Sequence, residues 1–318
     1  MKRFVPSQIP YWFAVFLLVG SALQSVGAAC LAPLQAPSQE ELQTARQHAH
    51  NRGFLWRISK AGHSSYLYGT IHVARLDWAF PGEDVLLAWR ATDTMALELN
   101  LLDADTLSRV QSGARDFDNR ALPAAFTAWV QQQARDNCLD LAKLQAMDPN
   151  FQIATITMEN ARHSGLEAAF GIDLMLTHMA SDTGRPIEAL ETAQEQLDAL
   201  KSDKEQDGQL ADIEAFSADE QERGQKVLLT LATAWEQSDL AALRNYEQWC
   251  ACMETASDRE QLKHLIDDRN VHFAKRIDAL HTSGRNVFAA VGSLHLTGAE
   301  KAVPDLLIRQ GYTVERVF

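Results

Sequence analysis

Positive charge is scarce in this sequence. Its 318 residues include 29 Lys and Arg against 42 Asp and Glu, which gives a formal net charge of −13. Nucleic acids and anionic membrane surfaces are bound through basic patches, so this balance argues against both as partners. Hydrophobic residues make up 46% of the chain and charged residues 22%, and this composition excludes wholesale disorder. We expect one large folded domain or two modest ones.

Long hydrophobic runs are absent beyond the N-terminus, which itself has the features of an export signal. Lys2 and Arg3 form a basic start, residues 11–23 are mainly apolar, and residues 27–29 (Gly-Ala-Ala) are small enough for cleavage. The apolar stretch is too short for a comfortable membrane span, so a retained signal anchor is the less favoured alternative. The sequence predicts a signal peptide over residues 1–29, export to a periplasm, and no membrane span in the mature chain.

Cysteine is rare, and the four cysteines are Cys30, Cys138, Cys250 and Cys252. An even number in an exported protein permits disulfides, and a pairing of Cys138 with Cys250 or Cys252 is plausible because both regions look helical. Cysteine spacing alone does not determine the connectivity. No second C-x-x-C or H-x-x-x-H motif accompanies Cys250-Ala-Cys252, so a zinc site there is not indicated. Cys30 follows the predicted cleavage site, but a lipidation motif needs a larger aliphatic residue than Gly27. A lipid anchor at Cys30 is therefore disfavoured.

Two segments far apart in the chain share one plan. Residues 66–72 (Tyr-Leu-Tyr-Gly-Thr-Ile-His) and 288–295 (Phe-Ala-Ala-Val-Gly-Ser-Leu-His) each consist of an apolar run followed by G-x-x-H. The motif residues are Gly69, His72, Gly292 and His295. An apolar run that ends in Gly is typical of a buried strand leaving a sheet, where Gly permits a tight turn or a close approach. Open α/β sheets bind ligands at such strand ends, so the repetition predicts a paired site.

The remaining patterns predict an α+β fold. Each G-x-x-H motif is followed by a helical pattern and another strand, as if one strand–motif–helix–strand unit were used twice. Residues 30–52 indicate a linker and a polar helix, and residues 103–280 are helical except for a candidate short strand at 187–191. The last helix, from Gly298, is expected to be interrupted at Pro304. We therefore expect a mixed β-sheet formed by the N- and C-terminal parts, with a single domain over residues 53–318 and a helical insertion at about 103–280.

A metal site is one way to combine the two motif histidines. Only folding could bring His72 and His295 together, and neutral imidazole is a common ligand of first-row metals. Glu98 stands in an apolar strand, where a carboxylate without a partner is unfavourable, so it is a candidate third ligand. Glu98 could instead be a general base beside a metal-activated water. The structural alternative is that each histidine only caps a strand through a backbone hydrogen bond.

Four further residues are candidates, Arg269 and Asn270 for catalysis and Asp173 and Glu191 for support, together with the two motif glycines. Arg269 and Asn270 lie among apolar positions on a predicted helix, and the guanidinium could hold a carbonyl, a carboxylate or Glu98 itself. A solvated Arg269 paired with Asp267 or Asp268 is the alternative. Asp173 is interpreted as a helix N-cap, and Glu191 as a cap or as a carboxylate behind the site. Ser293 lacks the G-x-S-x-G context of a serine hydrolase.

Taken in order, these motifs resemble the TraB/GumN family over roughly residues 50–318. This family includes TIKI-type metalloproteases and is related more distantly to erythromycin esterase and ChaN-like proteins. The resemblance rests on Tyr68-Gly-Thr-Ile-His72, Leu97-Glu98, Gly171-Ile-Asp173, Leu190-Glu-Thr192 with Gln196, Arg269-Asn270 and Gly292-Ser-Leu-His295-Leu-Thr-Gly298. The last motif has Gly-Ser-Leu-His where many relatives have Gly-Ala-Gly-His, which keeps the two fixed positions.

The resemblance implies a metal-dependent centre built from the paired histidines and the glutamate. It suggests manganese or cobalt, with zinc as a further candidate, and a peptide or small-molecule substrate. We expect an exported metal-dependent hydrolase, peptidase-like, in which His72, His295 and Glu98 bind the metal and Arg269 orients the substrate or stabilises an oxyanion. The alternative is a non-catalytic periplasmic module that binds a metal, haem or a peptide in the same cleft.

Overall fold

The computed structural model describes residues 30–115, 122–200, 218–250, 253, 256–297 and 301–318. The predicted signal peptide at residues 1–29 lies outside the described residues. The polar helix expected within residues 30–52 is α1 (Gln39–Gln47), and Ser38 and Glu41 form a capping box at its start.

A six-stranded mixed sheet, in the order β4-β3-β5-β2-β1-β6, organises the fold. The strands are β1 (Phe54–Lys60), β2 (His63–Thr70), β3 (Thr94–Leu97), β4 (Ile187–Ala189), β5 (Val287–Gly292) and β6 (Thr313–Arg316). β1 pairs antiparallel with both β2 and β6. The predicted α+β fold is confirmed, because strands from the two ends of the chain pair directly. The helical middle contributes β4 at one edge.

The strands β4, β3, β5 and β2 run parallel to one another. In this register Thr70 of β2 stands opposite Gly292 of β5, and Leu97 of β3 stands opposite Ala290 of β5. Parallel strands end at the same edge of a sheet. Consequently both G-x-x-H motifs and Glu98, which follows β3, leave the sheet next to one another.

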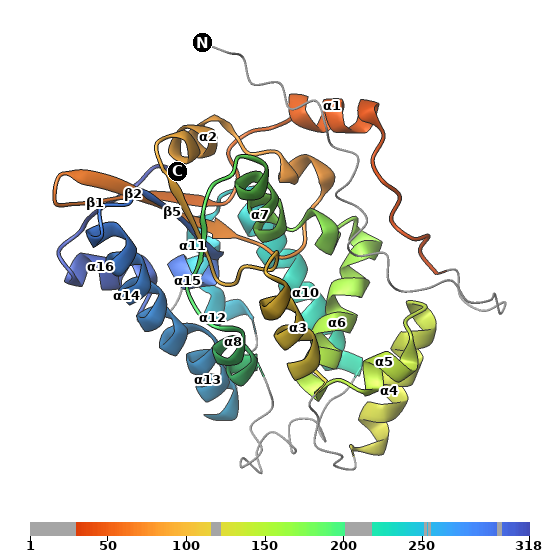
Figure 1. The fold of residues 1–318 in the computed structure, drawn as a ribbon. Helices are drawn as coiled ribbons and strands as arrows, with labels where there is room; N and C mark the ends of the chain where they lie inside the picture. The colour runs from red at the N-terminus through yellow and green to blue at the C-terminus, as the bar shows by residue number, and fades with distance from the viewer. Residues whose placement is uncertain (1–29, 116–121, 201–217, 251–252, 254–255, 298–300) are drawn as a thin grey trace.

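Helices cover both faces of this sheet. They are α2 (Glu83–Arg90), α14 (Arg269–Thr282) and α16 (Val303–Arg309). Figure 1 shows α14 and α16 on one side of the sheet and α2 on the other. The central strand β5 is buried from Val287 to Val291, which explains its continuous apolar sequence. Trp89 of α2 contacts Phe288 of β5 edge-on, with ring centroids 5.7 Å apart.

The middle of the chain is helical, as predicted. Its helices are α3 (Ala104–Gly113), α4 (Ala124–Asp136), α5 (Leu141–Gln145), α6 (Pro149–Ala161), α7 (Ile172–Asp182), α8 (Ala193–Leu200), α10 (Ala218–Glu236), α11 (Leu240–Arg244), α12 (Tyr246–Trp249) and α13 (Ala256–Leu262). Figure 1 shows α3 to α6 grouped away from the sheet. A second, smaller apolar cluster forms there, built on Phe126, Val130, Leu144 and Ile156.

Pro304 does not interrupt the last helix. It stands in the first turn of α16, which begins at Val303, where the missing backbone N–H would have had no partner within the helix. The expected break inside a longer helix is therefore wrong, and Pro304 starts the helix instead.

Cys138 has a different partner from the two that were plausible from the sequence. Cys138 forms a disulfide with Cys30, with Cα atoms 5.9 Å apart and a sequence separation of 108. Cys250 is disulfide-bonded as well. Cys138 pairs with Cys30 because the chain after residue 30 runs back past the helical middle, where the Arg162 guanidinium donates a hydrogen bond to the Ala32 carbonyl. Only the tertiary path of residues 30–38 decides this pairing.

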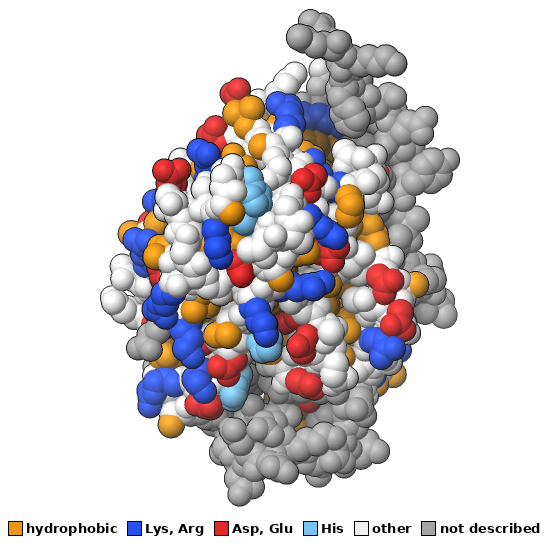
Figure 2. Space-filling view, turned by 60° about the vertical axis from the view of Figure 1, so that its left-hand side comes forward, with side chains coloured by type: hydrophobic (Ala, Val, Ile, Leu, Met, Phe, Trp, Pro, Cys, Tyr) orange, Lys and Arg blue, Asp and Glu red, His pale blue; other side chains and the backbone are white. Residues whose placement is uncertain are grey.

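The surface offers no broad patch of one charge on the face seen in Figure 2, where acidic and basic side chains are interspersed. Several basic side chains around α14 are paired: Arg276 and Arg285 with Glu188, and Lys60 with Asp278. None of the described helices combines the length and the apolar character that a membrane span requires.

Candidate functional site

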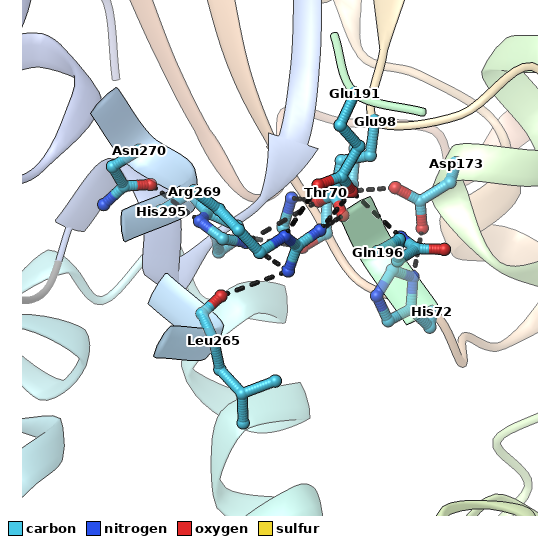
Figure 3. Close-up of polar contacts among 12 residues, drawn as sticks. Thr70, His72, Glu98, Asp173, Glu191, Gln196, Leu265, Arg269, Asn270 and His295 are labelled. Atoms are coloured by element: carbon cyan, nitrogen blue, oxygen red, sulfur yellow. Dashed lines mark hydrogen bonds and ion pairs between the residues drawn. The ribbon is translucent and has the colours of Figure 1, made fainter. Parts of the chain in front are cut away.

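The candidate site lies at the edge of the sheet where the parallel strands end. Figure 3 shows Arg269, Asn270 and His295 on one side, His72 and Asp173 on the other, and Glu98 and Glu191 between them. The site draws on both ends of the chain and on its middle. Each of the predicted site residues is brought here, together with Thr70 and Gln196.

His295 is buried and held in one orientation by two neighbours. It lies in the short helix α15 (Leu294–Thr297), and its side chain is 5% exposed. Its Nδ1 is 2.7 Å from Oδ1 of Asn270, and its Nε2 is 3.4 Å from the NH1 nitrogen of Arg269. A guanidinium can only donate, so Nε2 must accept and Nδ1 must carry the proton that goes to Asn270. His295 is thus neutral with its lone pair on Nε2, and burial lowers its pKa to about 4.

His72 is far more open, with a side chain that is 67% exposed. Its Nδ1 is 2.7 Å from Oδ2 of Asp173, whose other oxygen accepts a hydrogen bond from the Thr70 hydroxyl. The charge of Asp173 outweighs desolvation and raises the pKa of His72 to about 9. Among the described residues, no hydrogen bond to Nε2 of His72 is found, so this nitrogen is available to a ligand.

The interpretation of Asp173 as a helix N-cap is wrong. Gly171 is the N-cap of α7, and Asp173 stands one position after Ile172, the first helical residue. Because the start of α7 lies beside the end of β2, the Asp173 carboxylate reaches His72 and Thr70 instead. The amide of Ile172 donates to the Ile71 carbonyl and fastens the two segments together.

Glu98 is buried and has two partners, which explains how an apolar strand tolerates it. The backbone amide of Gly292 is 2.7 Å from its Oε1, and the NH2 nitrogen of Arg269 is 2.6 Å from its Oε2. Burial raises the pKa of Glu98, but His295, which is protonated at the low pH where Glu98 titrates, the charges of Arg269 and His72, and the Gly292 amide more than offset it and lower the pKa to about 2. Glu98 is therefore ionised at neutral pH.

Arg269 connects two carboxylates at the centre of the site. Its Nε and NH2 donate to Glu191 at 3.0 and 2.6 Å, and NH2 also donates to Glu98. The side chain is 12% exposed, so the alternative of a solvated arginine paired with Asp267 or Asp268 is wrong. Glu191 makes no cap, because Thr192 and Glu195 bond each other at the start of α8.

A π-helical turn, η5 (Lys263–Asp268), precedes Arg269. The backbone amide of Arg269 bonds to the carbonyl of Ile266. The NH1 nitrogen of Arg269 donates to the carbonyl of Leu265, which lies within the turn, at 3.1 Å. π-Helical turns recur at functional sites, and here one lies directly before the arginine and supplies a carbonyl that its guanidinium bonds.

No role for Thr70 or for the Leu265 carbonyl was predicted from the sequence. Thr70 could have been noticed as a polar residue between apolar strand residues and the motif histidine. In the structure its hydroxyl donates to Asp173 and orients that carboxylate. The π-helical turn has no sequence signal that we recognise. Gln196, quoted only for the family resemblance, donates to Glu191 at 3.2 Å.

The chemistry of these donors fits a divalent transition metal. Histidines that bind metals commonly donate their second nitrogen to a carboxylate or carbonyl, as His72 does to Asp173 and His295 to Asn270. Glu98 adds a carboxylate with Oε1 at 3.9 Å from Nε2 of His295. Among the described residues, no three His, Cys, Asp or Glu side chains are already grouped as metal ligands. The Arg269 guanidinium contacts both His295 and Glu98, two of the side chains that such a group of ligands would need.

The fold and the site together define an α+β protein with two G-x-x-H strand ends and a buried Glu–Arg–Glu cluster between them. The chain belongs to the TraB/PrgY/gumN family, whose model matches residues 54–316. The family resemblance seen in the motifs is thereby confirmed. Comparison with curated proteins and with solved structures gave no match.

Proposed function

We propose that this protein is an exported metal-dependent hydrolase, peptidase-like, with His72, His295 and Glu98 as the metal ligands. One observation carries the proposal. Each motif histidine has its Nδ1 engaged by a side chain, Asp173 or Asn270, so that Nε2 is the nitrogen that could bind a ligand. Among the described residues Nε2 of His72 has no hydrogen bond, and Nε2 of His295 has only the 3.4 Å contact with Arg269 beside the ionised Glu98. A histidine that only caps a strand needs no side-chain partner on Nδ1, whereas both motif histidines have one here. At neutral pH a metal would have to displace a proton from His72, so its binding is expected to weaken as pH falls.

When bound, manganese, cobalt or zinc would polarise a substrate carbonyl and make a water molecule more acidic. Glu98 is suited to bind the metal, because it remains ionised and is aimed by the Gly292 amide. As the base that takes the proton of the attacking water it would be weak, because its pKa is about 2 in the metal-free protein. Arg269 carries the positive charge that a developing oxyanion requires. Asn270 keeps the lone pair of His295 on Nε2.

The test is hydrolysis of a peptide library by the purified protein, first stripped of metal and then supplied with manganese, cobalt or zinc. We expect activity that needs metal and falls at least ~100-fold in His72→Ala, His295→Ala and Glu98→Gln, as is usual for ligands and general bases. His163→Ala, which removes an exposed histidine outside the site, is the matched control. Full activity of His295→Ala would contradict a shared site.

One observation favours the alternative of a non-catalytic binding module. All five N–H donors of Arg269 are already used by Glu98, Glu191, His295 and the Leu265 carbonyl, so the site as it stands presents no spare donor. Binding of metal, haem or a peptide without turnover of any peptide or ester would favour the module.

A further inference from the structure

Two groups would use the same lone pair of His295 in this site. A neutral imidazole has one lone pair, and on His295 it lies on Nε2, because Nδ1 donates its proton to Asn270. That lone pair already accepts from the NH1 nitrogen of Arg269 at 3.4 Å. One lone pair cannot serve both a metal ion and an N–H donor.

The same guanidinium neutralises the carboxylates on which a metal would depend. Its NH2 nitrogen lies 2.6 Å from an oxygen of Glu98 and 2.6 Å from an oxygen of Glu191. The side chains of Glu98 and Glu191 are 10% and 2% exposed, so solvent gives them little compensation. Arg269 thus supplies at Glu98 and His295 the positive charge that a divalent cation would supply.

We infer that Arg269 and the metal exclude each other at His295 and Glu98, so that Arg269 is a built-in competitor that keeps the metal-free site neutralised. The inference rests on the proposed function and deepens it. Metal binding would release two contacts of Arg269, NH1 with His295 and NH2 with Glu98. Its contacts with Glu191 and the Leu265 carbonyl do not involve the proposed ligands and can remain.

This exchange also answers how Arg269 could act on a substrate. With all five donors occupied, the guanidinium has none to offer an oxyanion. Release from His295 and Glu98 frees one N–H on NH1 and one on NH2. Both freed donors then lie next to the two metal ligands that they had contacted. Glu191 and Leu265 then keep the guanidinium at the site, so that metal loading both exposes and aims these donors.

Arg269→Met tests the inference, because methionine keeps much of the apolar stem and removes the charge. The matched control is Arg162→Met, since Arg162 also bridges two glutamates, Glu159 at 3.1 Å and Glu167 at 3.0 Å, outside the site. Calorimetric titration with Mn²⁺ alone and with Zn²⁺ alone gives the affinity. The melting temperature with and without each metal gives the stability.

We expect Arg269→Met to bind Mn²⁺ or Zn²⁺ at least ~10-fold more tightly than the unaltered protein. Without metal it should melt several degrees lower, because two buried carboxylates lose their counterion, and metal should restore the difference. Arg162→Met should lower the melting temperature without changing metal affinity. If Arg269→Met does not fold without metal, Arg269→Lys serves, because lysine keeps the charge but not the planar fork, and its affinity should exceed that of the unaltered protein.

Three results would overturn the inference. Equal metal affinity with and without Arg269 would mean that the two do not compete, and would leave the proposed metal-dependent function intact. Weaker binding in Arg269→Met and Arg269→Lys would make Arg269 a support for the metal. No binding of either metal by any of the variants or by the unaltered protein would remove the metal-dependent function itself, and the inference with it.

Discussion

The backbone amide of Gly292 lies 2.7 Å from Oε1 of Glu98 and donates a hydrogen bond to it. The first residue of the second G-x-x-H motif therefore holds the glutamate that follows the first motif in the chain. This is possible because β5 lies between β3 and β2, so that a strand from the C-terminal part reaches both N-terminal strands. The two motifs form one site through this pairing.

The two motif glycines should differ in their tolerance of alanine. Neither has a positive φ, so a strained backbone is not the reason for glycine at either position. A Cβ at Gly69 would lie 2.7 Å from Oγ of Ser293, whereas a Cβ at Gly292 would meet its nearest atom, Oε1 of Glu98, at an ordinary 3.4 Å. Ser293 cannot easily move, because its amide and hydroxyl both bond the Thr70 carbonyl.

We expect Gly69→Ala to lower the free energy of unfolding by about 1–3 kcal/mol, the usual range for overpacking, and Gly292→Ala to lower it by less. Urea denaturation of both variants is the measurement, and each glycine is the control for the other. Equal losses would mean that the approach of Ser293 to Gly69 does not explain the first glycine.

The pKa of His72 should depend on Asp173. In the metal-free protein, Asp173→Asn removes the charge that raises this pKa, so the pKa should move from about 9 toward the ordinary value near 6.5. NMR titration of the histidine Cε1–H signals measures it. Asp182→Asn is the control, because Asp182 is on the same helix and acts on His178. An unchanged His72 pKa in Asp173→Asn would refute the assigned pair.

Stability should fall in mild acid, and His281 should contribute to this fall alongside the buried His295. This fully buried side chain on α14 stacks on His63, and its ring nitrogens bond to Ser65 and to the Lys60 carbonyl. Burial lowers its pKa, so below pH ~6.5 the unfolded chain binds a proton that the folded chain does not. The free energy of unfolding then decreases as pH falls, by at most ~1.4 kcal/mol per pH unit for one proton, until the lowered pKa is reached.

Urea denaturation between pH 7.5 and 5 measures this effect in the unaltered protein, in His281→Gln and in His48→Gln. The glutamine at position 281 should reduce the slope and leave the part due to His295, whereas replacing the exposed His48 should leave the slope unchanged. The same slope in all three proteins would assign the acid sensitivity to other groups.

The disulfide between Cys30 and Cys138 should stabilise the protein. By loop entropy, closing a segment of 108 residues contributes at most about 5 kcal/mol, so Cys30→Ser and Cys138→Ser should both lower the melting temperature by similar amounts. Each should leave one new thiol that is alkylated without reduction. A thioether-linked lipid on Cys30 would need the same sulfur, so a lipidated Cys30, detected by intact mass, would contradict this disulfide.

Patterns with a local cause could be predicted from the sequence. The apolar runs that end in Gly69 and Gly292 predicted two strands with histidines after them, and the helical periodicity predicted the middle of the chain. Glu98 was noticed because a carboxylate in an apolar strand needs a partner. Arg269 was a candidate partner but could not be singled out, because 171 residues separate the two and local patterns do not report such a pairing.

The sequence by itself determined the elements and the residue types of this site, because strand and helix formation follow from short-range periodicity and local backbone preference. The tertiary structure decided which side chains meet. The parallel register of β2, β5 and β3 brings two histidines and a glutamate to one edge. The start of α7 gives Asp173 to His72, and Arg269, which follows a π-helical turn, reaches two carboxylates. Those contacts depend on packing between distant segments, which no local pattern specifies.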